Sequence, residues 1–487
     1  MPSFTITGTT TTQQTLDSGD TGFVSVLGAL ATSGTAVDSA GSVQLTVLGA
    51  INAFGGFAVD HDGTDIIVDI GSSGYVGSST SDSINALVTS SALVSNFGVI
   101  QSDSDALDLR DTDGSALIRV VNHGEISARS DGLVLQSGTG TTTVINTGTI
   151  TAQSYGIFNA FSGQAGVTYV DNSGLIQGYN LSYGGDDSID IIHNTGTMIG
   201  SVDLDDGDDI FDNRGGTLIG RVMGEHGDDT YITDDAALAI VELADEGTDE
   251  VQSTVNYTLG DFIENLTLLG VADLNGRGNV EDNLINGNVG DNVLRGYEGA
   301  DTIFAGAGED LIYGGDGDDS LGGNTDDDRL YGGLGNDTLA GGRGDDNLLG
   351  EGGNDNLSGF TGDDKLLGGA GNDSLRGQDG HDTLEGGSGK DTLVGGDGND
   401  LLTGNFNADR FVFGEGWGDD TITDFAATVD AEKIDLSGVA AITGFTDLSN
   451  NHMSQVGSDV VISDLAGNTI TLSGVTLGDL DANDFIF

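Results

Sequence analysis

A nine-residue repeat runs without a break through much of the second half of this 487-residue chain. The stretch GQDGHDTLEGGSGKDTLVGGDGNDLLT (377–403) contains the pattern G-x-x-G-x-D-x-L-x three times. The register begins at Gly278 and holds to Val412, which makes 15 consecutive units in 135 residues. Such a strict period predicts a solenoid, in which every unit packs against its neighbours along one axis.

Each unit divides into a short strand and a turn. The eighth position is apolar in all 15 units, and on a strand this side chain points inward. The glycines of the G-x-x-G-x-D segment supply positive φ angles and let neighbouring backbones approach closely. Two units make one coil, so units i and i+2 stack and their turns direct backbone carbonyls and carboxylates to the same point. Such oxygen ligands suit Ca²⁺, which takes about 6–8 of them, better than Mg²⁺, which demands octahedral geometry.

The sixth position is the predicted metal ligand. It is Asp in 13 units and Asn in the first two, Asn283 and Asn292. The predicted ligands are Asp301, Asp310, Asp319, Asp328, Asp337, Asp346, Asp355, Asp364, Asp373, Asp382, Asp391, Asp400 and Asp409. Asn at the sixth position of the first two units, Glu281 and Asp326 in place of the fourth-position glycine, and Asn407 in the last unit predict weaker or absent sites there. A metal-free solenoid with solvated acidic turns is the alternative, but aspartates stacked about 5 Å apart would repel one another.

The pattern resembles the RTX family, whose hemolysin-type repeats read G-G-x-G-x-D-x-U-x. The resemblance implies a parallel β-roll with Ca²⁺ ions in its turns.

Composition restricts the partners of the chain. Its formal net charge is −65, from 79 acidic and 14 basic residues, so it would be repelled by nucleic acid and by anionic membranes. Cations, above all calcium, are the expected partners. Cysteine is absent, no apolar run approaches the ~20 residues that span a bilayer, and the N-terminus lacks the pattern of a Sec signal peptide. We therefore expect no membrane insertion, and any export must use another signal.

A looser repeat precedes the strict one. The segments NFGVI (96–100), NHGEI (122–126), NTGTI (146–150), NSGLI (172–176) and NTGTM (194–198) recur every 22 to 26 residues. Short apolar alternations lie between them, which predicts about three strands per coil, an Asn–Gly corner and a ladder of stacked Asn side chains. The segments resemble the repeats of bacterial surface β-helices.

Acidic turns also occur inside these longer coils. GGDDSIDI (184–191), DGDDIFDN (206–213) and HGDDTYIT (226–233) place Asp187, Asp209 and Asp229 about one coil apart. We predict a calcium ladder on one edge of the β-helix, with a solvated acidic corner as the alternative.

Together these patterns predict an all-β chain: a continuous parallel β-solenoid, formed by an N-terminal β-helix and a calcium β-roll, with a C-terminal β cap. The expected parts are an N-terminal cap (1–20), a parallel β-helix (21–235), connecting strands (236–277), the RTX β-roll (278–412) and a C-terminal cap with the secretion signal (413–487). A cap is expected because the last coil of a solenoid is an open sheet edge. By resemblance to the family, the closing Asp484–Phe487 looks like a type I secretion signal; an ordinary final strand is the alternative.

We expect no enzyme and no catalytic residues. The sequence contains neither HExxH nor GxSxG, and Asp60-His61-Asp62 has the composition of an exposed loop. Because parallel β-helices also host polysaccharide lyases and epimerases, we considered Arg110, Arg119 and Arg129, in neighbouring coils beside Asp108, Asp111 and Asp113, as the one candidate groove. Structural ion pairs explain these arginines more simply.

The first functional hypothesis is a secreted calcium-binding structural protein of the surface of a Gram-negative bacterium. It would self-assemble into an S-layer, filament or matrix, with folding and assembly driven by Ca²⁺, after export by the type I secretion apparatus. Low cytosolic calcium would keep the array open, and millimolar calcium outside the cell would fold it. An adhesin that binds a glycan or a neighbouring surface is the second hypothesis, and a polysaccharide lyase or epimerase is the third.

Overall fold

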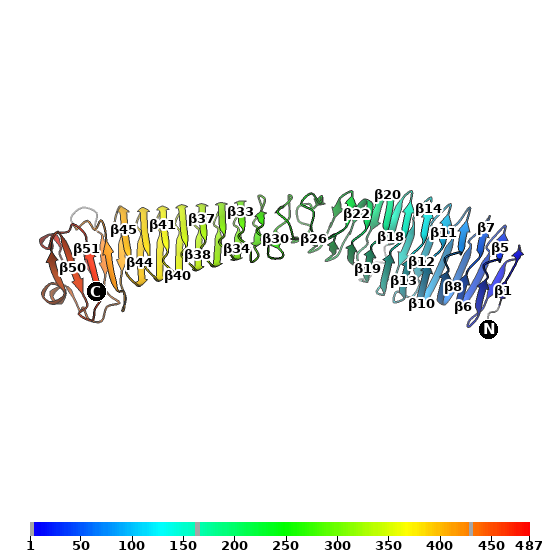
Figure 1. Ribbon diagram of the computed structural model, residues 1–487, viewed down its shortest axis with the longest axis horizontal. Helices are drawn as coiled ribbons and strands as arrows, with labels where there is room; N and C mark the ends of the chain where they lie inside the picture. The colour runs from blue at the N-terminus through cyan, green and yellow to red at the C-terminus, as the bar shows by residue number, and fades with distance from the viewer. Residues whose placement is uncertain (1–3, 161–165, 428–431) are drawn as a thin grey trace. The chain divides into compact units, whose positions relative to one another are not determined.

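The computed structural model describes residues 4–160, 166–427 and 432–487. The chain forms two compact units, Met1–Gln252 (unit 1) and Ser253–Phe487 (unit 2). The coils of each unit form a parallel β-solenoid (Figure 1). The predicted all-β class and the parallel solenoid, with mixed strands toward the C-terminus, are confirmed. Among the residues just given, no helix is both long and apolar enough to span a bilayer.

Unit 1 is a three-sided solenoid in which successive coils add parallel strands to three stacks. The first stack comprises β1 (Phe4–Ile6), β4 (Thr21–Val24), β6 (Val37–Val47), β8 (Val59–Ile70), β10 (Ile84–Asn96), β13 (Leu117–Asn122), β16 (Thr141–Asn146), β19 (Val167–Asn172), β21 (Ile189–Asn194), β23 (Ile210–Asp212), β26 (Thr230–Thr233) and β28 (Glu250–Ser253). The second comprises β2 (Thr9–Thr10), β5 (Ala29–Thr32), β7 (Ala50–Ala53), β9 (Tyr75–Ser78), β11 (Val99–Ser102), β14 (Glu125–Ala128), β17 (Thr149–Ala152), β20 (Leu175–Gly184), β22 (Thr197–Asp203) and β24 (Thr217–Ile219). The third comprises β3 (Gln14–Leu16), the first halves of β6, β8 and β10, β12 (Leu107–Asp111), β15 (Leu133–Gln136), β18 (Tyr155–Asn159), the ends of β20 and β22, β25 (Val222–Met223) and β27 (Ile240–Val241).

The Asn–Gly corner holds adjacent coils of unit 1 in register. Along the corner, each Asn amide N–H donates to the Asn Oδ1 of the next coil at 2.7–2.8 Å until Asn213, which only accepts; this confirms the predicted ladder. Its members are Asn96, Asn122, Asn146, Asn172, Asn194 and Asn213. The glycine two residues after the Asn is required by close approach. A Cβ atom at Gly124 would collide with the carbonyl oxygen of Gly98, and one at Gly148 with that of Gly124.

Two local predictions for unit 1 differ from the structure. The solenoid already begins at β1, which pairs in parallel with β4, inside the segment predicted as a cap. His61 does not lie in an exposed loop; it lies on β8 and is 1% exposed, with its Nδ1 3.1 Å from the hydroxyl of Ser39. Strand alternation turns this ring inward between the flanking aspartates, and burial lowers its pKa.

Unit 2 is a two-sided solenoid with one strand of each coil on each side. One side holds β29 (Tyr257–Thr258), β31 (Asn275–Arg277), β33 (Val293–Glu298), β35 (Leu311–Asp316), β37 (Arg329–Leu334), β39 (Asn347–Gly352), β41 (Lys365–Ala370), β43 (Thr383–Ser388), β45 (Leu401–Phe406) and β47 (Asp419–Ile422). The other holds β30 (Asn265–Leu268), β32 (Leu284–Asn286), β34 (Thr302–Ala307), β36 (Ser320–Thr325), β38 (Thr338–Arg343), β40 (Asn356–Thr361), β42 (Ser374–Asp379), β44 (Thr392–Asp397), β46 (Arg410–Val412) and β48 (Lys433–Asp435).

The strands of the repeat are longer than the sequence suggested. In β41 the strand covers six residues, so it continues through Gly368, the first position of the next unit, and only three residues remain for the turn. Leu366 and Gly368 are the two inward positions, and both are buried. The stacked apolar side chains are fully buried from Ile285 to Phe411, except for Leu321 at 2% exposure, and they form the core of this unit.

The C-terminal segment closes unit 2, and its described residues form mixed strands and three short helices. These are β49 (Met453–Val456), β50 (Asp459–Ser463), β51 (Thr469–Leu472), β52 (Phe485–Ile486), α1 (Phe445–Asp447), η1 (Leu448–His452) and η2 (Leu477–Asp479). β51 continues the parallel stack on β47, after which β50 and β49 pair antiparallel. β52 pairs with β48, so part of Asp484–Phe487 forms a last strand; its role as a secretion signal stays a prediction.

Candidate metal centre

The thirteen predicted aspartates of the repeat occupy equivalent places in unit 2. Each is the last residue of a turn and directly precedes a strand, as Asp364 precedes β41. All thirteen are only 1–3% exposed although they carry a carboxylate. Strand alternation explains this burial, because the Asp side chain points inward two positions before the buried Leu.

The aspartates form two ladders, one along each edge of the solenoid. One carboxylate oxygen, Oδ1, accepts the backbone N–H of the residue two units earlier at 2.6–2.9 Å. Asp346 thus donates to Asp364, and Asp364 donates to Asp382, both at 2.8 Å. The structure therefore brings the predicted residues together in the stacking order expected for units i and i+2.

The second carboxylate oxygen, Oδ2, is buried and has no hydrogen-bond partner among the described residues. This holds for Asp301, Asp310, Asp319, Asp328, Asp337, Asp346, Asp355, Asp364, Asp373, Asp382, Asp391 and Asp400. A buried charged oxygen without a partner is strongly destabilising, so a row of such atoms points to a bound cation.

Glycine at the first position of every unit except the one that begins with Ala305 makes room for these oxygens. A Cβ atom at Gly314 would collide with Oδ2 of Asp319 and would lie 2.7 Å from the carbonyl oxygen of Gly332. The carboxylate oxygen and the backbone carbonyl of the next coil therefore both border the space that a side chain at this position would fill. Carboxylate and carbonyl oxygens, without nitrogen or sulfur ligands, fit a hard cation such as Ca²⁺.

The charge state of the ladders agrees with this fit. Burial, followed by repulsion from neighbouring aspartates, raises the pKa of Asp364 to about 7 and that of Asp328 to about 8, against an ordinary value of 3.8. At neutral pH the ladders thus require either protons or a cation.

The start of the array is built differently. Asn283 replaces Asp, and its amide nitrogen donates to the carbonyls of Ile263 and Glu264 at 3.2 Å. Asn292 likewise donates to the side chain of Asn288 at 3.1 Å. The Asn amides donate hydrogen bonds to these neighbouring oxygens, so no cation is needed to neutralise them. This agrees with the weaker or absent metal sites predicted for the first two units.

The far end of the array extends beyond the predicted register. Asp420 is 1% exposed, its Oδ1 accepts the backbone N–H of Asp400 at 2.8 Å, and its Oδ2 has no partner in the described part of the chain. Asp420 stands 20 residues after Asp400 instead of 18, so the strict nine-residue pattern missed it. The segment GDDTI (418–422) was the signal that could have identified it.

A similar ladder exists in unit 1, but it uses Asp190 where the sequence suggested Asp187. Asp187 is exposed, whereas Asp190 is buried and donates its backbone N–H to Asp209 at 2.7 Å. Asp209 donates in turn to Asp229 at 2.8 Å. The strand register decides this, because Ile191 pairs with Ile210 and so places Asp190 opposite Asp209. The Gly-Asp-Asp pattern concealed the register, since the turn before Asp190 has Ser188 in place of glycine.

The family model of the RTX calcium-binding nonapeptide repeat matches four segments: 278–321, 322–357, 358–393 and 385–422. The chain carries RTX calcium-binding repeats. Because these repeats bind calcium, the oxygen-lined ladders of unit 2 belong to a calcium-binding array with several ions. The matched segments include Asp420 and thus the end of the array that the spacing missed.

Comparison with solved structures gives a distant similarity. The extracellular lipase LipA from Serratia marcescens is 18% identical, with a TM-score of 0.23, over 50% of this chain and 45% of the lipase. The chain therefore spans less than half of the lipase. No curated protein matches the chain.

The three arginines of the candidate groove do not share a face. Arg110 lies on β12, Arg119 on β13, and Arg129 follows β14, so they belong to three different sides of the coil. Arg110 donates to both carboxylate oxygens of Asp108 at 2.6 and 2.7 Å, and Arg129 pairs with Asp103 at 3.2 Å. These contacts are structural ion pairs.

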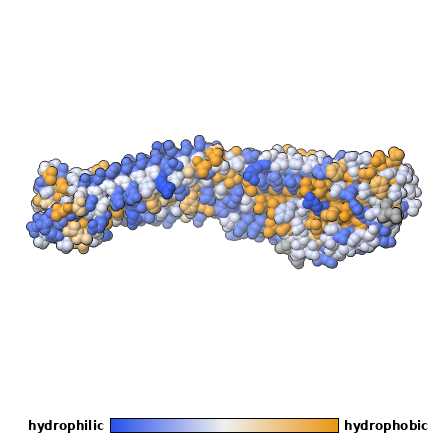
Figure 2. Space-filling model, turned by 60° about the horizontal axis from the view of Figure 1, so that its bottom comes forward, coloured by the Kyte–Doolittle hydropathy of each residue, from blue (hydrophilic) through white to orange (hydrophobic). Residues whose placement is uncertain are grey.

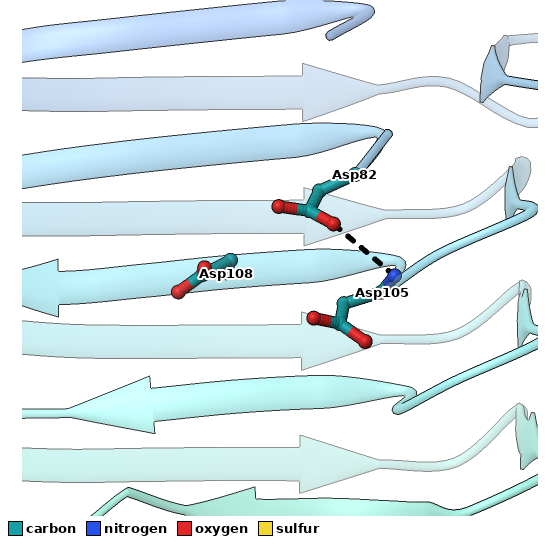
Figure 3. Close-up of side chains that lie close together, drawn as sticks. All are labelled: Asp82, Asp105 and Asp108. Atoms are coloured by element: carbon teal, nitrogen blue, oxygen red, sulfur yellow. Dashed lines mark hydrogen bonds between the residues drawn. The ribbon is translucent and has the colours of Figure 1, made fainter. Parts of the chain in front are cut away.

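Asp108 also belongs to an acidic cluster with Asp82 and Asp105 (Figure 3). The backbone N–H of Asp105 donates to Asp82 at 3.2 Å, which joins two adjacent coils. Since Arg110 already neutralises the buried member of the cluster, these carboxylates differ from the ladder carboxylates of the RTX array.

Proposed function

We propose that the chain is an exported calcium-binding structural protein of the bacterial cell surface, whose folding and self-assembly are driven by Ca²⁺. The observation that supports this most is the pair of buried ladders from Asp301 to Asp420, with one unpartnered oxygen on each of their members named above. An array of this kind cannot be compact and fully ionised without counter-ions.

The same feature suits export. In the low calcium of the cytosol, repulsion along the ladders keeps the array open, which suits passage through a type I secretion apparatus. In millimolar calcium outside the cell, the free energy of ion binding drives folding. Residues Asp484–Phe487 would serve as the secretion signal.

Assembly is proposed from the surface of unit 1. Apolar residues form patches on the face of this unit that Figure 2 shows. Unit 1 as a whole exposes several apolar side chains, among them Leu27 at 85%, Phe54 at 62% and Phe97 at 53%. Exposed patches of apolar side chains mark contact surfaces, and a second copy of this chain is the partner that a structural protein requires.

Electron microscopy and light scattering of the purified full chain, with calcium and with a chelator, test the proposal. We expect sheets or filaments in calcium and their loss with the chelator. Asp364→Asn, at a buried ladder position, should raise the calcium concentration needed for assembly. Asp363→Asn, which removes the same charge from the exposed neighbouring residue, should leave that concentration unchanged. A protein that folds with calcium yet remains monomeric at high concentration would contradict the assembly role.

Adhesion is a second candidate, because unit 1 also exposes aromatic rings that can pack on a ligand, among them Tyr179 at 85%. Binding of the full chain to a panel of glycans or to cells, without self-assembly, would favour adhesion.

A further inference from the structure

Three buried carboxylates meet in unit 1, outside the segments that match the RTX repeat. Asp229 precedes β26, Glu242 follows β27, and Asp249 precedes β28. Their exposures are 1%, 4% and 1%, and one oxygen of each lies within 4.8 Å of the other two. The nearest matched residue of the RTX repeat is Gly278.

Two oxygens in this cluster are buried without a hydrogen-bond partner in the described ranges: Oδ2 of Asp229 and Oε2 of Glu242. The other contacts of the cluster are fixed. The backbone N–H of Asp229 donates to Oδ1 of Asp249 at 2.9 Å, and the hydroxyl of Tyr231 donates to Oε1 of Glu242. These hydrogen bonds hold the carboxylates in place and leave Oδ2 of Asp229 and Oε2 of Glu242 without a hydrogen-bond donor in the described ranges.

Gly224 completes the frame. A Cβ atom there would collide with Oδ2 of Asp229 and with the Tyr231 hydroxyl, and would lie 2.6 Å from Oε1 of Glu242. Gly224 stands five residues before Asp229, as Gly314 stands five residues before Asp319 in the array. The turn of Asp229 thus repeats the construction of an RTX turn, and Glu242 adds a third carboxylate.

The neighbouring charges increase the negative potential. The groups that act on Asp229 and Glu242 are acidic, among them Asp208, Asp228 and Glu246. Burial is the largest cause that raises the pKa of Asp229 to about 7 and that of Glu242 to about 8.

We propose that Asp229, Glu242 and Asp249 bind a calcium ion in unit 1, separate from the RTX array. The ligand atoms are oxygens, which suits Ca²⁺ or Mg²⁺; three carboxylates in one buried site favour the larger ion, since Mg²⁺ keeps several of its waters. The inference deepens the proposed calcium dependence and rests on it, because it makes unit 1 calcium-dependent as well.

Hydrogen–deuterium exchange of the full chain, followed by mass spectrometry, tests the site locally. Peptides that cover 222–252 report on the cluster, and peptides from 296–409 report on the array. With a dissociation constant of about 10⁻⁴–10⁻³ M, about 5 mM Ca²⁺ should slow exchange in 222–252 by about 6- to 50-fold relative to chelator. Mg²⁺ at the same concentration should have a smaller effect.

Glu242→Gln and Asp249→Asn remove one charge each and keep an oxygen acceptor. Both should abolish the calcium response of 222–252, slow its exchange in chelator, and leave the response of the array intact. Asp245→Asn, which removes a charge from an exposed residue of the same turn, should behave like the unmodified protein. Exchange in β13 and β16 shows whether each variant is folded.

The outcomes separate the two proposals. If 222–252 exchanges equally with and without calcium while the array responds, the three carboxylates are neutralised by protons and not by calcium, and the site proposed here is wrong. A response that survives in folded Glu242→Gln also contradicts it. If 222–252 responds and the array does not, the site stands and the calcium-driven folding of the array fails. Should both variants misfold, the calcium response of the unmodified chain, with an anomalous diffraction peak between the three carboxylates, decides the question.

Discussion

Replacement of Asp364 by Asn should change the sign of its effect on stability between calcium and chelator. Asn keeps the oxygen that accepts the backbone N–H of Asp346 at 2.8 Å. It replaces the unpartnered Oδ2 with an amide nitrogen, which cannot bind a cation. Geometry is thus nearly preserved while the metal ligand is lost.

The two effects can be estimated. At about 10 mM free Ca²⁺, a site with a dissociation constant of about 10⁻⁴–10⁻³ M contributes about 1.4–2.7 kcal/mol, and the variant should lose this amount. Without calcium, burial raises the pKa of Asp364 to about 7 against the ordinary 3.8. At pH 8 this difference corresponds to up to about 4 kcal/mol of destabilisation in the folded array, which the variant is relieved of.

Urea unfolding in calcium and pH-induced unfolding in chelator, both followed by the fluorescence of Trp417, measure the two effects. Trp417 is the only tryptophan of the chain, is 2% exposed and stands in the last turn of the array. In calcium the variant should unfold at a lower urea concentration than the original chain, and in chelator its array should stay folded to a higher pH. Asp363→Asn, at an exposed position, should change the stability in neither condition by more than ~0.5 kcal/mol. A variant destabilised equally in both conditions would refute the reasoning, because a structural defect does not depend on calcium.

Three further predictions concern pH, the Asn ladder and the glycine corner. Burial raises the pKa of Asp346 to about 6 and of Asp328 to about 8, so the calcium-free folded array binds more protons than the unfolded chain. Circular dichroism in chelator should therefore show a folded array below about pH 4 that is lost as the pH rises through about 6–8, and an array equally unfolded at every pH would contradict this. Asn146→Ala removes three hydrogen bonds, to Asn122, Asn172 and the carbonyl of Leu175, so urea unfolding should show a loss of about 1.5–4.5 kcal/mol, while Thr147→Ala at the exposed neighbour should be nearly neutral. Gly124→Ala forces adjacent coils apart and should lower the free energy of unfolding by about 1–3 kcal/mol; Gly34→Ala, where a Cβ meets open space, serves as its control.

Strict periodicity made unit 2 predictable from the sequence. The spacing of nine fixes which aspartates stack, because every coil has the same length, and the structure pairs Asp346, Asp364 and Asp382 as expected. The spacing could not show that one carboxylate oxygen accepts a backbone N–H while the other is left for a cation. That depends on the backbone N–H of the neighbouring coil, which only the register of the strands determines.

Prediction failed where the coil length varies. The sequence points to Asp187 instead of Asp190 and passes over Asp420, because local motifs do not reveal an offset of two or three residues between neighbouring coils. Glu242 could not be predicted as a ligand for a different reason. It belongs to no motif, and only the fold of the coil brings it within reach of Asp229 and Asp249. His61 was misplaced because its acidic neighbours suggested a loop, although alternation on a strand buries the ring between two outward carboxylates.

Crystals of the full chain grown in calcium would test the central claim most directly, through an anomalous difference map. The account predicts peaks beside the Oδ2 atoms of the ladder from Asp310 to Asp400, and none at Asn283 or Asn292, whose amides already satisfy their neighbours. Ladders without peaks, or peaks confined to exposed aspartates such as Asp363, would contradict it.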